Sequence, residues 1–107
     1  MIGRKRRREV DFNEVLAPFQ EWGPQLRLPF EKRCRKRYPW ATDADVKAWQ
    51  ESCETVKREA HALGEKYRLD QLDEADFKPE LQRRFPELND RSLTFAWFEE
   101  RYIIWHG

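Results

Sequence analysis

A chain of 107 residues has room for one domain, and although 38% of its residues are charged, the net charge is only +1. Such polarity can signal disorder, but an aromatic content of 14% predicts a small aromatic core beneath a charged surface. The sequence has no apolar run near the roughly 18 residues of a membrane helix, and its start, MIGRKRRREV, does not resemble a secretory signal. We therefore expect a cytoplasmic protein with reduced thiols and no membrane contact.

The charge is distributed unevenly along the chain. Residues 1–40 hold eleven Lys/Arg and five Asp/Glu, a net of +6, whereas residues 41–107 hold ten and fifteen, a net of −5. This asymmetry predicts either two faces of opposite potential or an arm that reaches a polyanion. Alternatively, the two halves pair with each other inside the monomer.

Residues 1–10 are predicted to form a flexible basic arm, and residues 11–107 a single helical domain. Five consecutive like charges within the arm repel one another and cannot be buried together. They are Arg4, Lys5, Arg6, Arg7 and Arg8.

The first helix is predicted to begin at Asp11, which can cap it, with Glu14 placed for a capping box. Its apolar face would comprise Phe12, Val15, Leu16 and Phe19. Pro18 lacks an amide N–H, so we expect the helix to kink or restart there, and Gly23-Pro24 to end the segment.

A second short helix can start at Pro29 and run to Arg37, because proline is tolerated in the first turn. Phe30, Cys34 and Tyr38 would then face inward. Tyr38-Pro39 should end this helix, since a residue before proline avoids the helical region.

A long helix is predicted over residues 43–67, capped by Thr42. Its apolar or small residues recur at spacings of three and four and so form one stripe. They are Val46, Trp49, Cys53, Val56, Ala60, Leu63 and Tyr67. Gly64 leaves two alternatives, an end near Leu63 or a helix that tolerates the glycine. The stripe favours intramolecular packing over a coiled-coil homodimer, because two large aromatics and a thiol suit a regular seam poorly.

Two further helices are predicted after residue 72. Asp76 can cap the first, which would run through Phe85 with Pro79 in its first turn and Phe77 and Leu81 inward. The last helix has three competing cap residues, Asn89, Asp90 and Ser92. Its apolar residues form two rows. The first row is Phe95, Phe98, Tyr102 and Trp105, and the second is Leu93, Trp97 and Ile104. A short strand over residues 101–105 is the weaker alternative, because the sequence offers no second strand to pair with it.

Together these elements predict an all-α fold, a small bundle of four to five helices around the long helix. Enzymatic chemistry is not expected, because the sequence contains no phosphate-binding loop, nucleophile elbow or informative pair of carboxylates. We also expect no cofactor and no metal, since Cys34, Cys53, His61 and His106 lack the spacing of metal ligands. Cys53 should be buried and His61 exposed.

The leading functional hypothesis is a small binding protein that contacts nucleic acid or a nucleoprotein assembly. The basic arm would reach phosphates, and a second basic run with adjacent aromatics would extend the surface. Besides the arm's five residues, this predicted site comprises Lys32, Arg33, Arg35, Lys36, Arg37, Tyr38 and Trp40.

The alternative is a protein-interaction module, such as an adaptor, an antitoxin or immunity-type protein, or an inhibitor of a larger complex. It would use the acidic surface and the aromatic last helix, through Trp97, Phe98, Tyr102 and Trp105. The last two helices also have helix-turn-helix proportions, with Asn89, Arg91, Ser92 and Thr94 near base edges. An ordinary helical hairpin explains them better, because neighbouring carboxylates would repel phosphates. A monomer is favoured over a homodimer.

Overall fold

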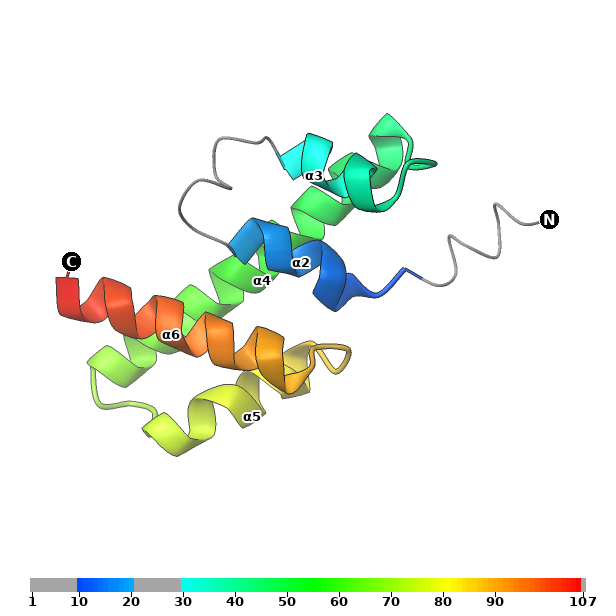
Figure 1. Cartoon of the computed structure of the whole chain (residues 1–107). Coiled ribbons are helices and arrows are strands. Elements are labelled where there is room, and N and C mark those ends of the chain that lie inside the picture. Colours follow the sequence, from blue (N-terminus) through cyan, green and yellow to red (C-terminus); the bar gives the residue numbers. More distant parts are fainter. Residues whose placement is uncertain (1–9, 21–29, 107) are drawn as a thin grey trace. The chain divides into compact units, whose positions relative to one another are not determined.

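The computed structural model describes residues 10–20 and 30–106, apart from the side chain of His106. All elements of this part of the chain are α-helices, and it contains no strand (Figure 1). They are α2 (Phe12–Gln20), α3 (Phe30–Arg37), α4 (Asp43–Arg68), α5 (Glu74–Arg84) and α6 (Asp90–His106). The predicted all-α fold with one long helix is confirmed, and the strand considered for residues 101–105 is helical instead.

The chain divides into two compact units, Met1–Cys53 and Glu54–Gly107, with the boundary inside α4. The long helix thus contributes its first half to one unit and its second half to the other. Of the predicted basic arm, only Val10 lies within the described residues.

In the N-terminal unit, α2 begins where predicted. The Asp11 carboxylate accepts a 2.9 Å hydrogen bond from the backbone N–H of Asn13, which satisfies one of the free donors of the first turn. Glu14 accepts hydrogen bonds from Arg37, the last residue of α3, and from Tyr38 just after it, instead of completing a capping box. The helix continues through Pro18 for two residues and then ends at Gln20.

The core of this unit contains residues of the predicted apolar faces. Val15, Leu16 and Cys34 are each no more than 2% exposed. Phe19 of α2 meets Phe30 of α3 edge-on, with ring centroids 5.8 Å apart, so aromatic packing joins the two short helices.

Helix α4 begins with a reciprocal cap. Thr42 Oγ1 accepts a hydrogen bond from the Asp45 N–H (3.1 Å), and the Asp45 carboxylate accepts one from the Thr42 N–H (2.9 Å). The helix runs past Gly64 to Arg68, so the longer alternative is correct. It ends where Asp70 takes a positive φ of 59° and the Gln71 N–H bonds back to the Lys66 carbonyl (2.7 Å). The predicted stripe lies inward, with Cys53 fully buried.

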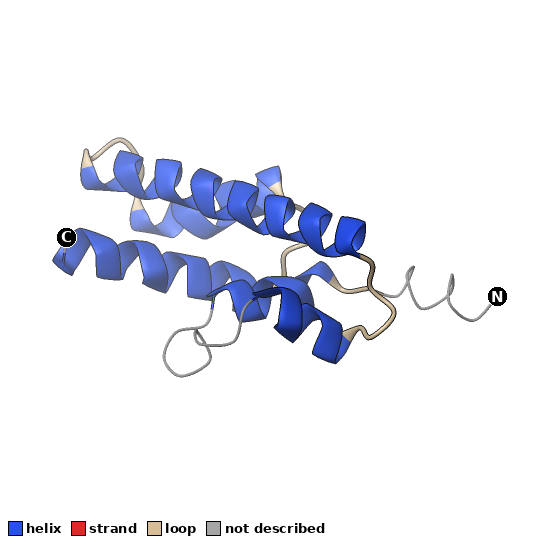
Figure 2. Ribbon diagram, turned by 90° about the horizontal axis from the view of Figure 1, so that it is seen from above, coloured by secondary structure: helices blue, strands red, loops and turns tan. Residues whose placement is uncertain are grey.

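In the C-terminal unit, α5 and α6 form a helical hairpin, and α6 runs beside the second half of α4 (Figure 2). Phe77 and Leu81 of α5 are completely buried, as predicted. The predicted start of α5 at Asp76 is wrong. The helix begins at Glu74 with Asp73 as its cap residue, and the Asp76 N–H bonds to the Asp73 carbonyl (3.0 Å). Pro79 therefore falls beyond the first turn.

Candidate functional site

Helix α6 is apolar on two sides, of which one is buried and the other is largely exposed. Phe98, Tyr102 and Trp105 are 60%, 52% and 73% exposed. Their spacing of four and three residues places them on one side of the helix, which we call the outer face of α6. Each residue turns the helix by about 100°, so the buried residues lie roughly opposite. These are Ser92, Leu93, Ala96, Trp97 and Glu100.

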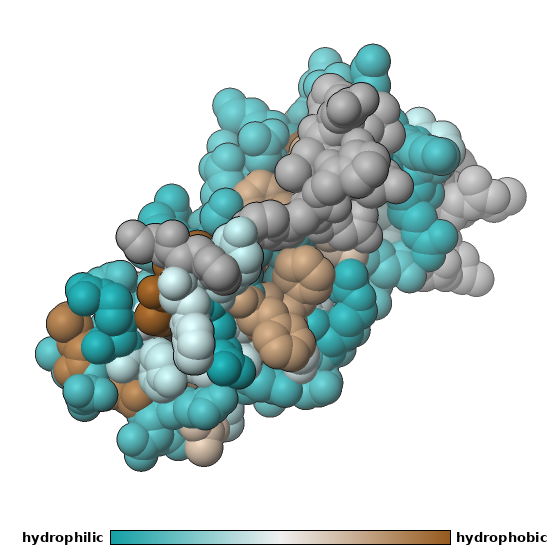
Figure 3. All heavy atoms as spheres, turned by 60° about the vertical axis from the view of Figure 1, so that its left-hand side comes forward, coloured by the Kyte–Doolittle hydropathy of each residue, from teal (hydrophilic) through white to brown (hydrophobic). Residues whose placement is uncertain are grey.

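The outer face is uncommon for a helix because its exposed residues are large aromatics that follow one another over two turns. Hydrophilic side chains cover much of the face drawn in Figure 3, and hydrophobic patches interrupt them. Phe98, Arg101, Tyr102 and Trp105 line a shallow hollow in the surface. A contiguous apolar patch that contains a hollow is typical of a site that another molecule covers.

Trp97 lies on the other side of α6. It is 7% exposed, and its ring packs edge-on against Tyr67 of α4 (5.1 Å) and at a tilt against Phe77 of α5 (4.8 Å). The ring of Trp97 therefore holds α6 against two helices, and its contribution to an interface stays a prediction. It supports the outer face from within.

Arg101 joins the two sides. Its guanidinium lies 5.8 Å from the centre of the Trp97 ring and 6.0 Å from that of Trp105. Both distances fit cation–π contacts. Glu74 of α5 approaches it at 3.8 Å, between side chains that are 40% and 60% exposed. Arg101 thus lies at the border of the outer face of α6 and places a positive charge beside its aromatic rings.

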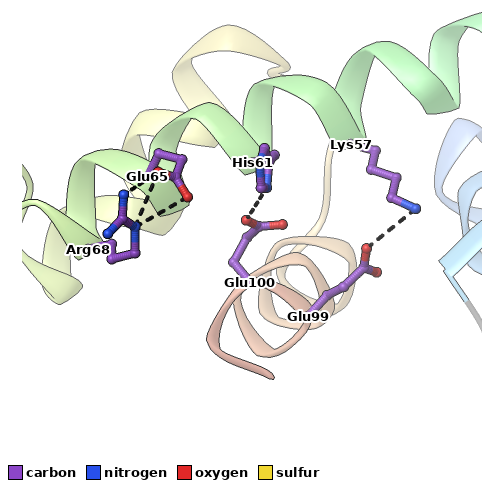
Figure 4. A network of polar contacts seen from close by, with 6 residues as sticks. All are labelled: Lys57, His61, Glu65, Arg68, Glu99 and Glu100. Carbon is purple, nitrogen blue, oxygen red and sulfur yellow. Dashed lines mark hydrogen bonds and ion pairs between the residues drawn. The ribbon is translucent and has the colours of Figure 1, made fainter. Parts of the chain in front are cut away.

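A buried carboxylate fixes α6 against α4 (Figure 4). Glu100 is 3% exposed and lies 3.1 Å from His61 Nδ1, and its oxygen would stand 2.5 Å from a Cβ at Gly64. Gly64 is therefore needed for this close approach, which explains why α4 tolerates it. Burial raises the pKa of Glu100, while the charge and hydrogen bond of His61 oppose that rise.

Contacts with α4 also fix which way Glu99 and Glu100 point. Glu99 reaches Lys57 of α4 at 4.0 Å, one turn before the His61–Glu100 pair. Figure 4 shows both carboxylates directed toward α4. They point away from the outer face, which leaves Arg101 as the charged residue at its hollow.

The second basic run lies on and just after α3, and two of its arginines are already paired. Arg37 donates to Glu14 of α2 at 2.8 and 3.2 Å, and these hydrogen bonds lower the pKa of that carboxylate. Arg35 pairs with Asp43 and more loosely with Glu31 (3.6 Å). The positive charge of the run is therefore partly neutralised within the unit.

The aromatics beside the run are also engaged. The Tyr38 hydroxyl donates to Glu14 (2.8 Å), and its buried ring packs against Trp40 and Trp49, each at 5.6 Å. Arg33 and Trp40 are partly buried, whereas Lys32 and Lys36 are exposed one turn apart. The residues Arg4 to Arg8 lie outside the described residues.

Three of the four candidate positions of the helix-turn-helix alternative are already engaged within the protein. Ser92 is fully buried, and Thr94 Oγ1 lies 2.7 Å from Lys78 Nζ. Asn89 instead caps α6 by accepting a hydrogen bond from the Ser92 N–H (2.9 Å). The pair α5–α6 is thus a helical hairpin whose turn residues serve the fold.

The described part of the chain contains no group of three or more His, Cys, Asp or Glu that could hold a metal ion. Cys34 and Cys53 are free and buried, and burial raises the pKa of Cys34 to about 11. That thiol is therefore protonated and unreactive at neutral pH.

Comparisons with known proteins add no relative. No protein-family model, curated protein or solved structure matches this chain significantly. Among the described residues, none of the helices combines the length and apolarity needed to cross a membrane.

The contact between His61 and Glu100 was not predicted from the sequence. The two residues are separated by 39 positions, and neither belongs to a motif. A weak signal was present: Gly64 lies within the predicted helix, next to the stripe residue Leu63, and a glycine inside a helix often has a packing reason.

Proposed function

We propose that this protein is a protein-interaction module whose binding surface is the outer face of α6. The observation that carries the proposal is the exposure of Phe98, Tyr102 and Trp105 on one side of a helix whose opposite side is fully packed. Aromatic side chains in such a patch supply large contact areas at little cost in side-chain entropy, which is why they dominate binding energy at interfaces.

The rigidity of the surface strengthens this proposal. Trp97, Phe77 and Tyr67 hold α6 from behind, and the Glu100–His61 contact fixes it to α4. A partner that binds the outer face therefore meets side chains on an ordered helix and has little backbone to order.

Photo-crosslinking tests the proposal. Benzoylphenylalanine placed at Tyr102 should yield a crosslinked heterologous protein in the cells that make this protein. The same probe at Ile103, which is 37% exposed on a different side of α6, is the matched control. Loss of the Tyr102 product in the Phe98→Ala/Trp105→Ala variant supports the proposal. Equal products from both positions, or none from Tyr102, contradict it.

Nucleic-acid contact is a second candidate, favoured by one observation. Lys32 and Lys36 are exposed on the same side of α3, so two charges of the basic run face solvent. An electrophoretic titration with mixed RNA and DNA at low and physiological salt tests it, with Lys32→Glu/Lys36→Glu as the variant. Salt-sensitive binding that the variant weakens supports this candidate, and no binding at low salt excludes it.

A further inference from the structure

The outer face of α6 has the geometry that a helix uses to bind another helix. Phe98, Tyr102 and Trp105 stand at positions i, i+4 and i+7, the spacing of anchor residues in helix-in-groove recognition. Ridges on one helix pack into depressions on another, and the hollow beside Arg101 is such a depression. A partner helix lying along α6 could insert one aliphatic side chain there.

Two arginines of α6 border this face, while the exposed Asp90 at the start of the helix is paired with Lys78 at 3.0 Å. Arg101 borders the hollow, and the exposed Arg91 lies seven residues, or about two turns, before Phe98 on the same side of α6. Glu99 and Glu100 are directed toward α4 by Lys57 and His61. Glu74 is the described carboxylate paired with Arg101, and at 3.8 Å its contact is loose.

From this charge pattern we infer that the occupant is an acidic amphipathic helix of another protein, aliphatic along one side and bordered by Asp or Glu. Its aliphatic residues cover Phe98, Tyr102 and Trp105, and its carboxylates pair with Arg101 and Arg91. The inference rests on the proposed function and narrows it to one class of partner.

Charge also separates this occupant from a second copy of the chain. A two-fold dimer through the outer face would place the same arginines of both copies within one interface. Like charges brought together at an interface are unfavourable, so they disfavour self-association. The same arginines select against a basic helix.

Two labelled peptides of about 18 residues test the inference, because that length suffices for a stable helix. Both carry the same leucine stripe; one is bordered by Glu and the other by Lys. Fluorescence anisotropy with the full chain should show the Glu-bordered peptide binding at least about tenfold more tightly. Phe98→Ala/Trp105→Ala should weaken this binding by about tenfold or more, and the control Ile103→Ala by less than about twofold.

Reversal of one charge tests the assignment of Arg101. In Arg101→Glu the preference for the Glu-bordered peptide should fall by about tenfold, with an unchanged helical circular dichroism spectrum as the check of folding. Arg101→Gln should give an intermediate ratio. Equal binding of both peptides, or a ratio that Arg101→Glu leaves unchanged, overturns the inference.

Two other occupants are tested in parallel. If sedimentation shows a dimer and Phe98→Ala/Trp105→Ala dissociates it, the outer face binds a second copy and the inference is overturned. If the protein binds phosphatidylcholine–phosphatidylserine vesicles and the same variant abolishes that binding, the outer face binds a membrane and the inference is likewise overturned. A Tyr102 crosslink to a cellular protein, together with no binding of the Glu-bordered peptide, would retain the proposed function and reject only this class of partner.

Discussion

The second basic run and the outer face of α6 were both predicted from the sequence as binding surfaces, and the structure treats them differently. At the basic run, Arg35 and Arg37 form intramolecular ion pairs, and the Tyr38 hydroxyl bonds to Glu14. On α6, three aromatic rings face solvent. Charged side chains of a basic run can thus be paired with residues elsewhere in the chain, whereas these three aromatic side chains each remain more than half exposed.

The sharpest test of this comparison uses two adjacent aromatics of α6. Trp97→Ala should lower the free energy of unfolding by about 3–5 kcal/mol, because a buried ring is replaced by a cavity. Phe98→Ala should change it by no more than about 0.5 kcal/mol, since Phe98 is 60% exposed. Urea denaturation followed by far-UV circular dichroism measures both. Similar losses for the two variants would show that Phe98 belongs to the core.

The close approach of α6 to α4 gives the next largest effect. Gly64→Ala should destabilise the protein by about 1–3 kcal/mol, because the new Cβ would stand 2.5 Å from a Glu100 oxygen and displace it from His61. In the Glu100→Ala background the same substitution should stabilise by up to about 1 kcal/mol, the helix propensity difference. A Gly64→Ala effect of the same sign in both backgrounds would refute the steric explanation.

Acid should affect the two regions in opposite directions. Burial raises the pKa of Glu100 in the folded state, so its contribution to stability is fully present below the ordinary pKa of glutamate and is lost as pH rises through the raised value. The free energy of unfolding of Glu100→Gln should therefore rise relative to that of the wild type as pH increases from the ordinary pKa of glutamate to the raised value. The rise should be at most about 1.4 kcal/mol per pH unit. Urea titrations between pH 4 and 8 measure it, and a constant difference would contradict the raised pKa.

The contribution of Glu14 to stability should have the opposite pH dependence, and it is the smallest of the effects expected. Hydrogen bonds from Arg37 and Tyr38 lower its pKa, so its contribution is present above the ordinary pKa and is lost as pH falls through the lowered value. Because Glu14 is exposed, Glu14→Gln should cost less than about 1 kcal/mol at pH 7, and the difference should vanish in acid. A Glu14→Gln loss that persists at pH 3 would assign the effect to packing.

Much of the fold follows from local rules that act within a few residues. The caps at Asp11 and Thr42, the stop at Tyr38-Pro39 and the buried position of Cys53 were all predicted. The start of α5 was predicted wrongly, because Asp73 and Asp76 are both acceptable cap residues. In the structure the Asp76 N–H bonds to the Asp73 carbonyl, so Asp76 lies inside the first turn.

The candidate site was only partly predictable because α6 has two apolar rows. One contains Phe98, Tyr102 and Trp105, and the other contains Trp97; periodicity alone cannot tell which row faces the core. Packing of α4 and α5 selects the row of Trp97, through contacts with Tyr67 and Phe77. The pairing of Glu14 with Arg37 across 23 positions was equally invisible to local rules.

One paired measurement tests whether the outer face of α6, and not the second basic run, binds the partner protein. The Tyr102-crosslinked partner would be purified and its affinity determined for two variants, Phe98→Ala/Trp105→Ala and Lys32→Glu/Lys36→Glu. We expect the affinity to fall by about tenfold or more for the first variant and by less than about twofold for the second. The reverse order would contradict this expectation.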